Sequence, residues 1–180
     1  MTVNFLDRRH RLEAVKRDIL LYIYDPAGNA PACTSNVEIV GARWAARVDN
    51  AQGLSLQFVP VDNNIPILRP DGSDESRCDG MLLYTADETD TGLDRPQGIA
   101  FVELKDEGEG WISHAVDQLR TTVTCFNACH PDVQFRWRYA YAANCRHPKF
   151  QVSHKDRMQQ FRQLTGFRLL IQDVVRIRRQ

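Results

Sequence analysis

The chain has 180 residues, of which 43% are hydrophobic and 26% are charged, so it has the size and composition of one soluble globular domain. It contains no apolar run near the ~18 residues that a membrane helix needs, and its charged N-terminus does not resemble a secretory signal. Five cysteines, an odd number, without an export signal predict reduced thiols and a cytoplasmic protein. We therefore expect one domain over residues 1–180 and no membrane partner.

The net charge of zero hides a strong segregation of charge along the chain. Residues 71–110 hold twelve Asp or Glu against three Lys or Arg, whereas residues 111–180 hold twelve Lys or Arg against four Asp. The basic part predicts an anionic partner such as nucleic acid, and the alternative is two oppositely charged surfaces that attract each other. The candidates for phosphate contacts are Arg136, Arg138, Lys149, Lys155, Arg157, Arg162 and the tail 176–179.

The first half of the chain predicts two helices and three strands. Residues 3–24 carry apolar residues at roughly helical spacing with basic residues between them, which indicates an amphipathic N-terminal helix. Ser35 and Glu38 have the spacing of a capping box and predict a second helix, with apolar positions 37, 40, 44 and 48. Alternating patterns then predict strands over 54–60, 80–86 and 98–105, the last two forming a hairpin.

The second half of the chain alternates helices and strands. The pattern from Trp111 to about Cys129 is helical, with Ser113 as a candidate N-cap, and residues 133–143 alternate like a strand. Residues 153–164 predict a further helix, with Ser153 and Asp156 as its capping box, and a last strand should begin near residue 167. This order predicts a mixed α/β fold with helices on the faces of a sheet.

One group of charged residues stands where the hairpin strands should meet. Glu103 and Lys105 end an apolar strand and share a face with Phe101, because side chains alternate along a strand. Asp79 lies just before the partner strand, and the start of one hairpin strand lies beside the end of the other. Two neighbouring carboxylates repel unless a cation joins them, and oxygen ligands favour Mg²⁺. A lysine beside them would supply positive charge to a reacting phosphate, while the alternative is a surface ion pair at a strand end.

These residues and the order of the elements resemble the PD-(D/E)xK nuclease superfamily, since Asp79 is followed 24 residues later by Glu103-Leu104-Lys105. The resemblance implies a restriction-endonuclease-like αβββαβ core over about residues 36–143, built on a mixed sheet flanked by helices. An N-terminal helix and a C-terminal helix-strand extension would be additions to this core. Asp79 and Glu103 would bind Mg²⁺, or Mn²⁺ as its substitute, with the backbone carbonyl of Leu104. Lys105 would be the catalytic lysine.

Two further residues enter through the resemblance. Glu38 is similar to the acidic residue that many members carry on the helix before the first strand, where it extends the metal site; the alternative is that it only completes its capping box. Gln118 resembles the glutamine that RecB-like members carry after their lysine, and it could equally be an ordinary residue at the edge of the helix's apolar face.

The sequence departs from the family pattern at two places. Thr122 stands where RecB-like members carry a tyrosine, and Cys78 precedes Asp79 where a proline is expected. A literal Pro-Asp pair occurs at Pro70-Asp71, which makes Asp71 a rival first ligand. Asp79 is favoured because an apolar strand follows it directly.

The resemblance implies a metal-dependent nuclease that hydrolyses phosphodiester bonds, of DNA in preference to RNA, in restriction, repair or anti-phage defence. One alternative is a non-catalytic subunit with the nuclease fold that binds nucleic acid or a partner protein. Another is an RNA-directed nuclease. A single domain without a recognisable specificity domain predicts a homodimer or a place in a larger complex.

Overall fold

The computed structural model describes residues 3–26, 28–41, 45–105, 110–144 and 154–178. The protein is a mixed α/β structure with two mixed sheets and two α-helices in the part described. In chain order the elements are η1 (Arg8–His10), β1 (Leu20–Tyr24), β2 (Cys33–Ser35), β3 (Ala46–Asp49), β4 (Ser55–Pro60), β5 (Gly80–Thr85), β6 (Gly98–Lys105), α1 (Trp111–Cys129), β7 (Trp137–Asn144), α2 (Lys155–Thr165), β8 (Arg168–Ile171) and β9 (Val174–Arg176).

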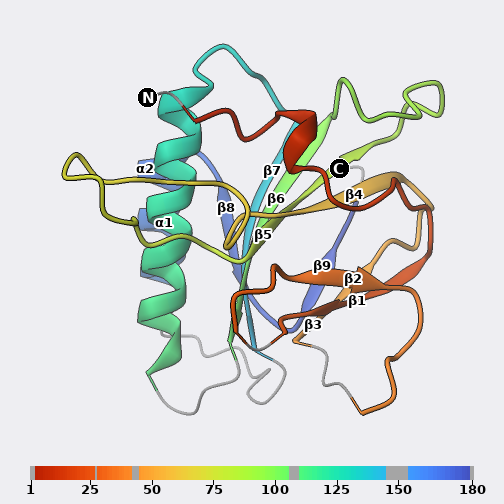
Figure 1. The fold of residues 1–180 in the computed structure, drawn as a ribbon, viewed down its shortest axis with the longest axis horizontal. Helices are drawn as coiled ribbons and strands as arrows, with labels where there is room; N and C mark the ends of the chain where they lie inside the picture. The colour runs from red at the N-terminus through yellow and green to blue at the C-terminus, as the bar shows by residue number, and fades with distance from the viewer. Residues whose placement is uncertain (1–2, 27, 42–44, 106–109, 145–153, 179–180) are drawn as a thin grey trace.

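The described elements form three layers (Figure 1). The central layer is a five-stranded sheet in the order β4-β5-β6-β7-β8, antiparallel from β4 to β6 and parallel from β6 to β8. Helices α1 and α2 pack on one face through a core that includes Phe101, Leu119 and Phe161. A four-stranded sheet in the order β2-β1-β3-β9 packs on the other face through a second core. The prediction of helices on both faces was therefore wrong for one face.

The central elements are the ones that periodicity predicted. Strands β4, β5 and β6, helix α1 and strand β7 lie within a few residues of their expected bounds, and β5 pairs with β6 as an antiparallel hairpin. Helix α2 and strand β8 confirm the C-terminal helix and strand. Ser113 is not the N-cap of α1, because Gly110 holds that position at φ 86°. Ser153 lies outside the described residues, and His154 precedes α2 without a side-chain cap.

The predicted N-terminal helix over residues 3–24 was wrong. The segment forms only the short turn η1 and then runs extended into β1. The backbone of Lys16 bonds to Leu56 in both directions, at 2.7 and 2.9 Å, so this segment covers part of the open edge of β4. Arg8 and Arg9 are exposed, whereas Arg11 turns inward and donates to the carbonyl oxygens of Gly92 and Leu93 at 2.8 and 3.0 Å. These tertiary contacts stabilise the extended conformation more than the local sequence pattern favours a helix.

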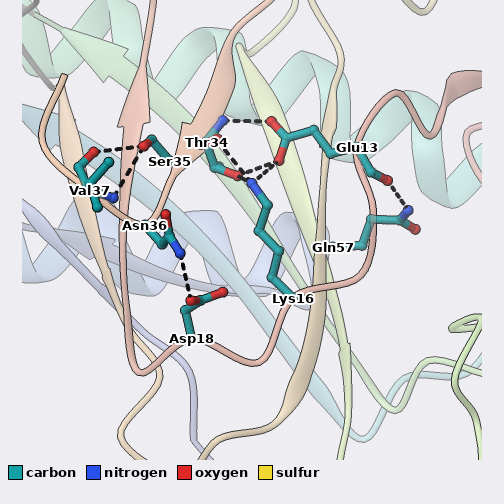
Figure 2. A network of polar contacts seen from close by, with 8 residues as sticks. All are labelled: Glu13, Lys16, Asp18, Thr34, Ser35, Asn36, Val37 and Gln57. Atoms are coloured by element: carbon teal, nitrogen blue, oxygen red, sulfur yellow. Dashed lines mark hydrogen bonds and ion pairs between the residues drawn. The ribbon is translucent and has the colours of Figure 1, made fainter.

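A polar network fixes the same segment to the small sheet (Figure 2). The Nζ of Lys16 donates to Glu13 at 2.8 Å and to the hydroxyl of Thr34 at 2.6 Å, and the backbone N–H of Thr34 donates to Glu13 at 2.6 Å. The side chain of Gln57, on β4, donates to the Glu13 carbonyl at 2.5 Å. The network therefore joins the N-terminal segment, β2 and β4, and it needs an extended backbone to do so.

The second predicted helix was wrong as well, so the first helix of the expected αβββαβ core is missing. Ser35 ends β2, and its hydroxyl bonds to the backbone of Val37, at 2.7 and 3.2 Å, rather than capping a helix. Val40, expected on the apolar face, is fully exposed, whereas Val48 is buried in strand β3. Trp44 lies outside the described residues. The core that the structure shows is therefore β4-β5-β6-α1-β7, with the small sheet in place of the first helix.

Candidate active site

The candidate active site lies at one edge of the large sheet, where three strands bring their ends together. The pairs Pro60–Gly80 and Gly80–Val102 place the end of β4, the start of β5 and the end of β6 side by side. Asp79 precedes β5 by one residue, so the antiparallel register carries it to the position of Glu103. The predicted approach of these two residues across the hairpin is confirmed.

Alternation along β6 turns its terminal charges toward the helices. Phe101 packs in the core beneath α1, and Leu104 packs in the core shared with the small sheet. Glu103 and Lys105 therefore lie on the helix side of the sheet, as the two-residue period of a strand requires. The position buries the carboxylate more deeply than the ammonium, with 1% and 16% of each side chain exposed.

The carboxylate of Glu103 is buried with few partners. Lys105 Nζ lies 2.7 Å from Glu103 Oε1 as an ion pair. The Lys105 ammonium and the backbone N–H of Asp79 both lower the pKa of Glu103. Asp79 in turn accepts a hydrogen bond from the backbone N–H of Leu104 at 2.5 Å. Two buried carboxyl groups that share one lysine are costly, and a cation beside them would reduce that cost.

Burial and mutual repulsion raise the pKa values of both carboxyl groups. The pKa of Glu103 lies well above its usual range because the residue is buried and because Asp79 is close, although Lys105 opposes the rise. Burial raises the pKa of Asp79 to about 7, the hydrogen bond from Leu104 opposes it, and the charge of Asp25 adds to it. Both carboxyl groups therefore hold their protons to a higher pH than exposed ones do, even with Lys105 present.

Helix α1 holds the lysine through Gln118. Lys105 Nζ donates to Gln118 Oε1 at 2.8 Å, and Gln118 Nε2 donates to the carbonyl oxygen of Arg77 at 3.0 Å. One turn later the hydroxyl of Thr122 donates to the Gln118 carbonyl at 3.0 Å and accepts from the backbone N–H of Cys78 at 2.8 Å. Thr122, which departs from the family pattern, thus binds α1 to the residue before Asp79. Gln118 is a contact of the lysine and more than a boundary residue.

Two other acidic candidates lie elsewhere. Asp71 is an exposed turn residue whose Oδ1 accepts from the backbone and hydroxyl of Ser73, at 2.9 and 2.6 Å. Glu38 is exposed in the irregular segment between β2 and β3, and no interaction among the described residues joins it to Asp79 or Glu103. Glu38 does not lie on a helix, and the expected helix was the reason for placing its carboxylate at the metal site.

The structure brings two carboxylates to the site that sequence reasoning missed. Asp25 follows β1 and Asp62 follows β4, and the charges of both raise the pKa of Asp79. Partial exclusion of water and the charge of Asp62 raise the pKa of Asp25, which Lys105 lowers. Arg77 pairs with Asp62 at 3.0 Å, whereas Asp25 forms no ion pair with a described residue. Asp25 stands one residue after β1 and Asp62 two residues after β4, so a carboxylate just past an apolar strand is the signal that could have found them.

Two carboxylates make up the donor set at the site. Among the described residues, no group of three or more His, Cys, Asp and Glu side chains is arranged to hold a metal ion. Asp79 and Glu103 therefore offer two carboxylates, and Lys105 occupies one oxygen of Glu103. Hard oxygen donors of this kind fit Mg²⁺ or Mn²⁺, which keep several waters and need only one or two protein carboxylates.

Two basic candidates for phosphate contacts are exposed on β7 and just before it. Arg136 lies over the ring of Trp137 at 5.2 Å, and Arg138 lies over the ring of Phe167 at 5.8 Å. These cation–π contacts account for their orientation without a ligand. Lys149 and Arg179 lie outside the described residues, so the expected basic surface is only partly visible.

Comparison with protein-family models, curated proteins and solved structures found no match to this chain. Neither of the two α-helices in the described residues has the length and apolar character needed to cross a bilayer.

Proposed function

We propose that the protein is a metal-dependent nuclease that hydrolyses phosphodiester bonds at the edge of the large sheet. The observation that carries the proposal is the burial of Glu103 beside Asp79 at a strand end, with Lys105 as its ion-pair partner. Burial of two neighbouring carboxyl groups beside one lysine is costly, and groups with pKa values perturbed in this way are common at functional sites. The preference for DNA over RNA rests on the resemblance alone.

In this proposal Asp79 and Glu103 hold Mg²⁺ or Mn²⁺, together with the backbone carbonyl of Leu104. The ion supplies Lewis-acid stabilisation of the phosphate and lowers the pKa of a bound water. Lys105 supplies a positive charge beside the phosphate, where negative charge develops in the transition state. Gln118 fixes the direction of the ammonium through its 2.8 Å hydrogen bond. Asp25 adds negative charge near Asp79 and so favours a cation at the site.

A cleavage assay with matched variants tests the proposal. Labelled single-stranded DNA, double-stranded DNA and RNA are incubated with Mg²⁺ or Mn²⁺ and with wild type, Asp79→Ala, Lys105→Ala or Asp71→Ala. We expect cleavage by wild type and Asp71→Ala, and loss of at least about 100-fold in the other two variants. Equal cleavage by all four proteins would refute the assignment, and the ratio of DNA to RNA cleavage decides the substrate.

A second candidate function is a non-catalytic subunit that keeps the site as a structural ion pair. Two observations favour it: the direct 2.7 Å contact of Lys105 with Glu103, and the lack of a group of three metal-binding side chains among the described residues. The same assay separates the two functions. Binding of nucleic acid without any product in Mg²⁺ or Mn²⁺ would establish the subunit and exclude the nuclease.

A further inference from the structure

A small groove lies on the opposite face of the large sheet from α1, where β7, β8 and β9 come together. Its volume is about 140 Å³, and its lining includes Tyr139, Tyr141, Arg168, Arg176 and Arg178. Tyr141 packs in the core shared with the small sheet, and Tyr139 packs against it. None of these residues belongs to the candidate active site, whose side chains lie on the helix side.

The groove concentrates positive charge without a matching carboxylate. Three guanidinium groups line it, and no Asp or Glu does so among the described residues. Arg168 and Arg178 form no hydrogen bond or ion pair with any residue in the described part of the chain, although both are exposed. Arg176 Nε lies 4.0 Å from Asp49 Oδ2, at the limit of an ion pair. Three guanidinium groups gathered in one groove form a favourable site for an anion such as phosphate.

The two tyrosines give the groove an apolar floor and a flat wall. Tyr141 is 1% exposed, and its hydroxyl donates to the carbonyl oxygen of Arg176 at 2.9 Å, which fixes the ring. Tyr139 is only partly buried, and its ring centroid lies 6.2 Å from that of Tyr141. A half-exposed ring held on a rigid strand is the type of surface on which nucleobases stack.

Size limits the ligand to one unit of a polymer. The groove is lined by few residues, so it takes one base or one phosphate and is too small for a duplex. Bases are free to stack on protein rings only where the strand is unpaired.

We infer that this groove binds one nucleotide unit of single-stranded nucleic acid, with Arg168 and Arg178 on the phosphate and Tyr139 against the base. The groove and the candidate active site share no residue, so this site can exist whether or not the protein cleaves. The same chemistry would also accept a free mononucleotide, and the experiment separates the two sources.

Binding is measured by fluorescence anisotropy of a labelled thymidine oligonucleotide in EDTA, where metal-dependent cleavage cannot occur. The test variants are the double change Arg168→Ala/Arg178→Ala and the single changes Tyr139→Leu and Tyr139→Phe. The matched control is Arg9→Ala/Arg120→Ala, which removes the same charge from two exposed arginines that pair with Asp7 and Asp117. Circular dichroism verifies that each variant is folded.

We expect the groove double variant to bind at least about ten-fold more weakly than the control, with a salt dependence shallower by ~1.4 in log–log slope. Tyr139→Leu should weaken binding about five-fold or more, and Tyr139→Phe should not. Thymidine monophosphate should compete better than inorganic phosphate, and the oligonucleotide better than both. Equal affinity of the groove and control variants would overturn the inference, as would equal competition by inorganic phosphate. A mononucleotide that competes as well as the oligonucleotide would overturn the assignment to a strand.

Because these measurements contain no turnover step, their failure would leave the cleavage proposal untouched. Loss of cleavage in the Asp79 and Lys105 variants would likewise say nothing about the groove. The two proposals can therefore fail separately.

Discussion

Removal of the negative charge of Asp79 should stabilise the metal-free protein at neutral and alkaline pH. The pKa of this carboxyl group rises from its ordinary value of 3.8 to about 7, mainly through burial. Because the folded-state pKa lies above the unfolded one, the folded chain keeps its proton at pH values where the unfolded chain has lost it. Metal-free wild type should therefore lose stability as the pH rises from about 4 to about 7.

The expected size of the effect follows from the same values. Each tenfold change in acidity is worth about 1.4 kcal/mol, so ionising Asp79 in the folded chain costs ~4 kcal/mol. Asn keeps an oxygen that accepts the hydrogen bond from Leu104, but burial of its amide group offsets part of the gain. We expect Asp79→Asn to exceed wild type by about 2–4 kcal/mol in free energy of unfolding near pH 8, and by much less near pH 4.

The assay is urea unfolding in EDTA, followed by tryptophan fluorescence near pH 4 and near pH 8. Asp71→Asn is the matched control, because hydrogen bonds from Ser73 lower the pKa of Asp71 and its charge should not be destabilising. The reasoning fails if Asp79→Asn is no more stable than wild type near pH 8. It also fails if the gain is the same at both pH values.

Two further predictions concern the contacts of α1. Thr122→Val removes the acceptor for the buried N–H of Cys78 and should lower the free energy of unfolding in urea by about 1–3 kcal/mol. Thr122→Ser keeps the hydroxyl and should lower it by less. Equal losses of stability in the two variants would show that the hydrogen bonds are not responsible. Gln118→Ala removes the Oε1 acceptor of Lys105 and should slow cleavage about 10- to 100-fold. Asp117→Ala, on the exposed side of α1, should not slow it. Unchanged cleavage by Gln118→Ala would show that Gln118 does not position the lysine.

The middle of the fold could be predicted because its local patterns agree with its tertiary environment. Strands β5 and β6 are buried apolar runs, and α1 buries one consistent face. The apolar runs therefore indicate strands correctly, and the helical spacing indicates the helix correctly. The N-terminal half could not be predicted in the same way. Its apolar spacing fits a helix, but Lys16 and Glu13 use their polar groups on β2 and β4, which a local pattern does not reveal.

The candidate site likewise contains residues that could be predicted from the sequence and one that could not. Asp79, Glu103 and Lys105 belong to one hairpin, so antiparallel register alone brings them together. Asp25 reaches the site from β1 in the other sheet, and its place depends on how the two sheets pack. The resemblance offered Glu38 as an extension of the metal site, on a helix that residues 36–41 do not form.

Metal binding by isothermal titration calorimetry tests the central claim most directly. Mg²⁺ and Mn²⁺ are titrated into wild type and into Glu103→Gln, which keeps the shape of the side chain and removes its charge. The account predicts binding in the micromolar to millimolar range by wild type near pH 8, and its loss in the variant. No binding by wild type, or the same binding by both proteins, would contradict the account and leave Glu103 as half of a structural ion pair.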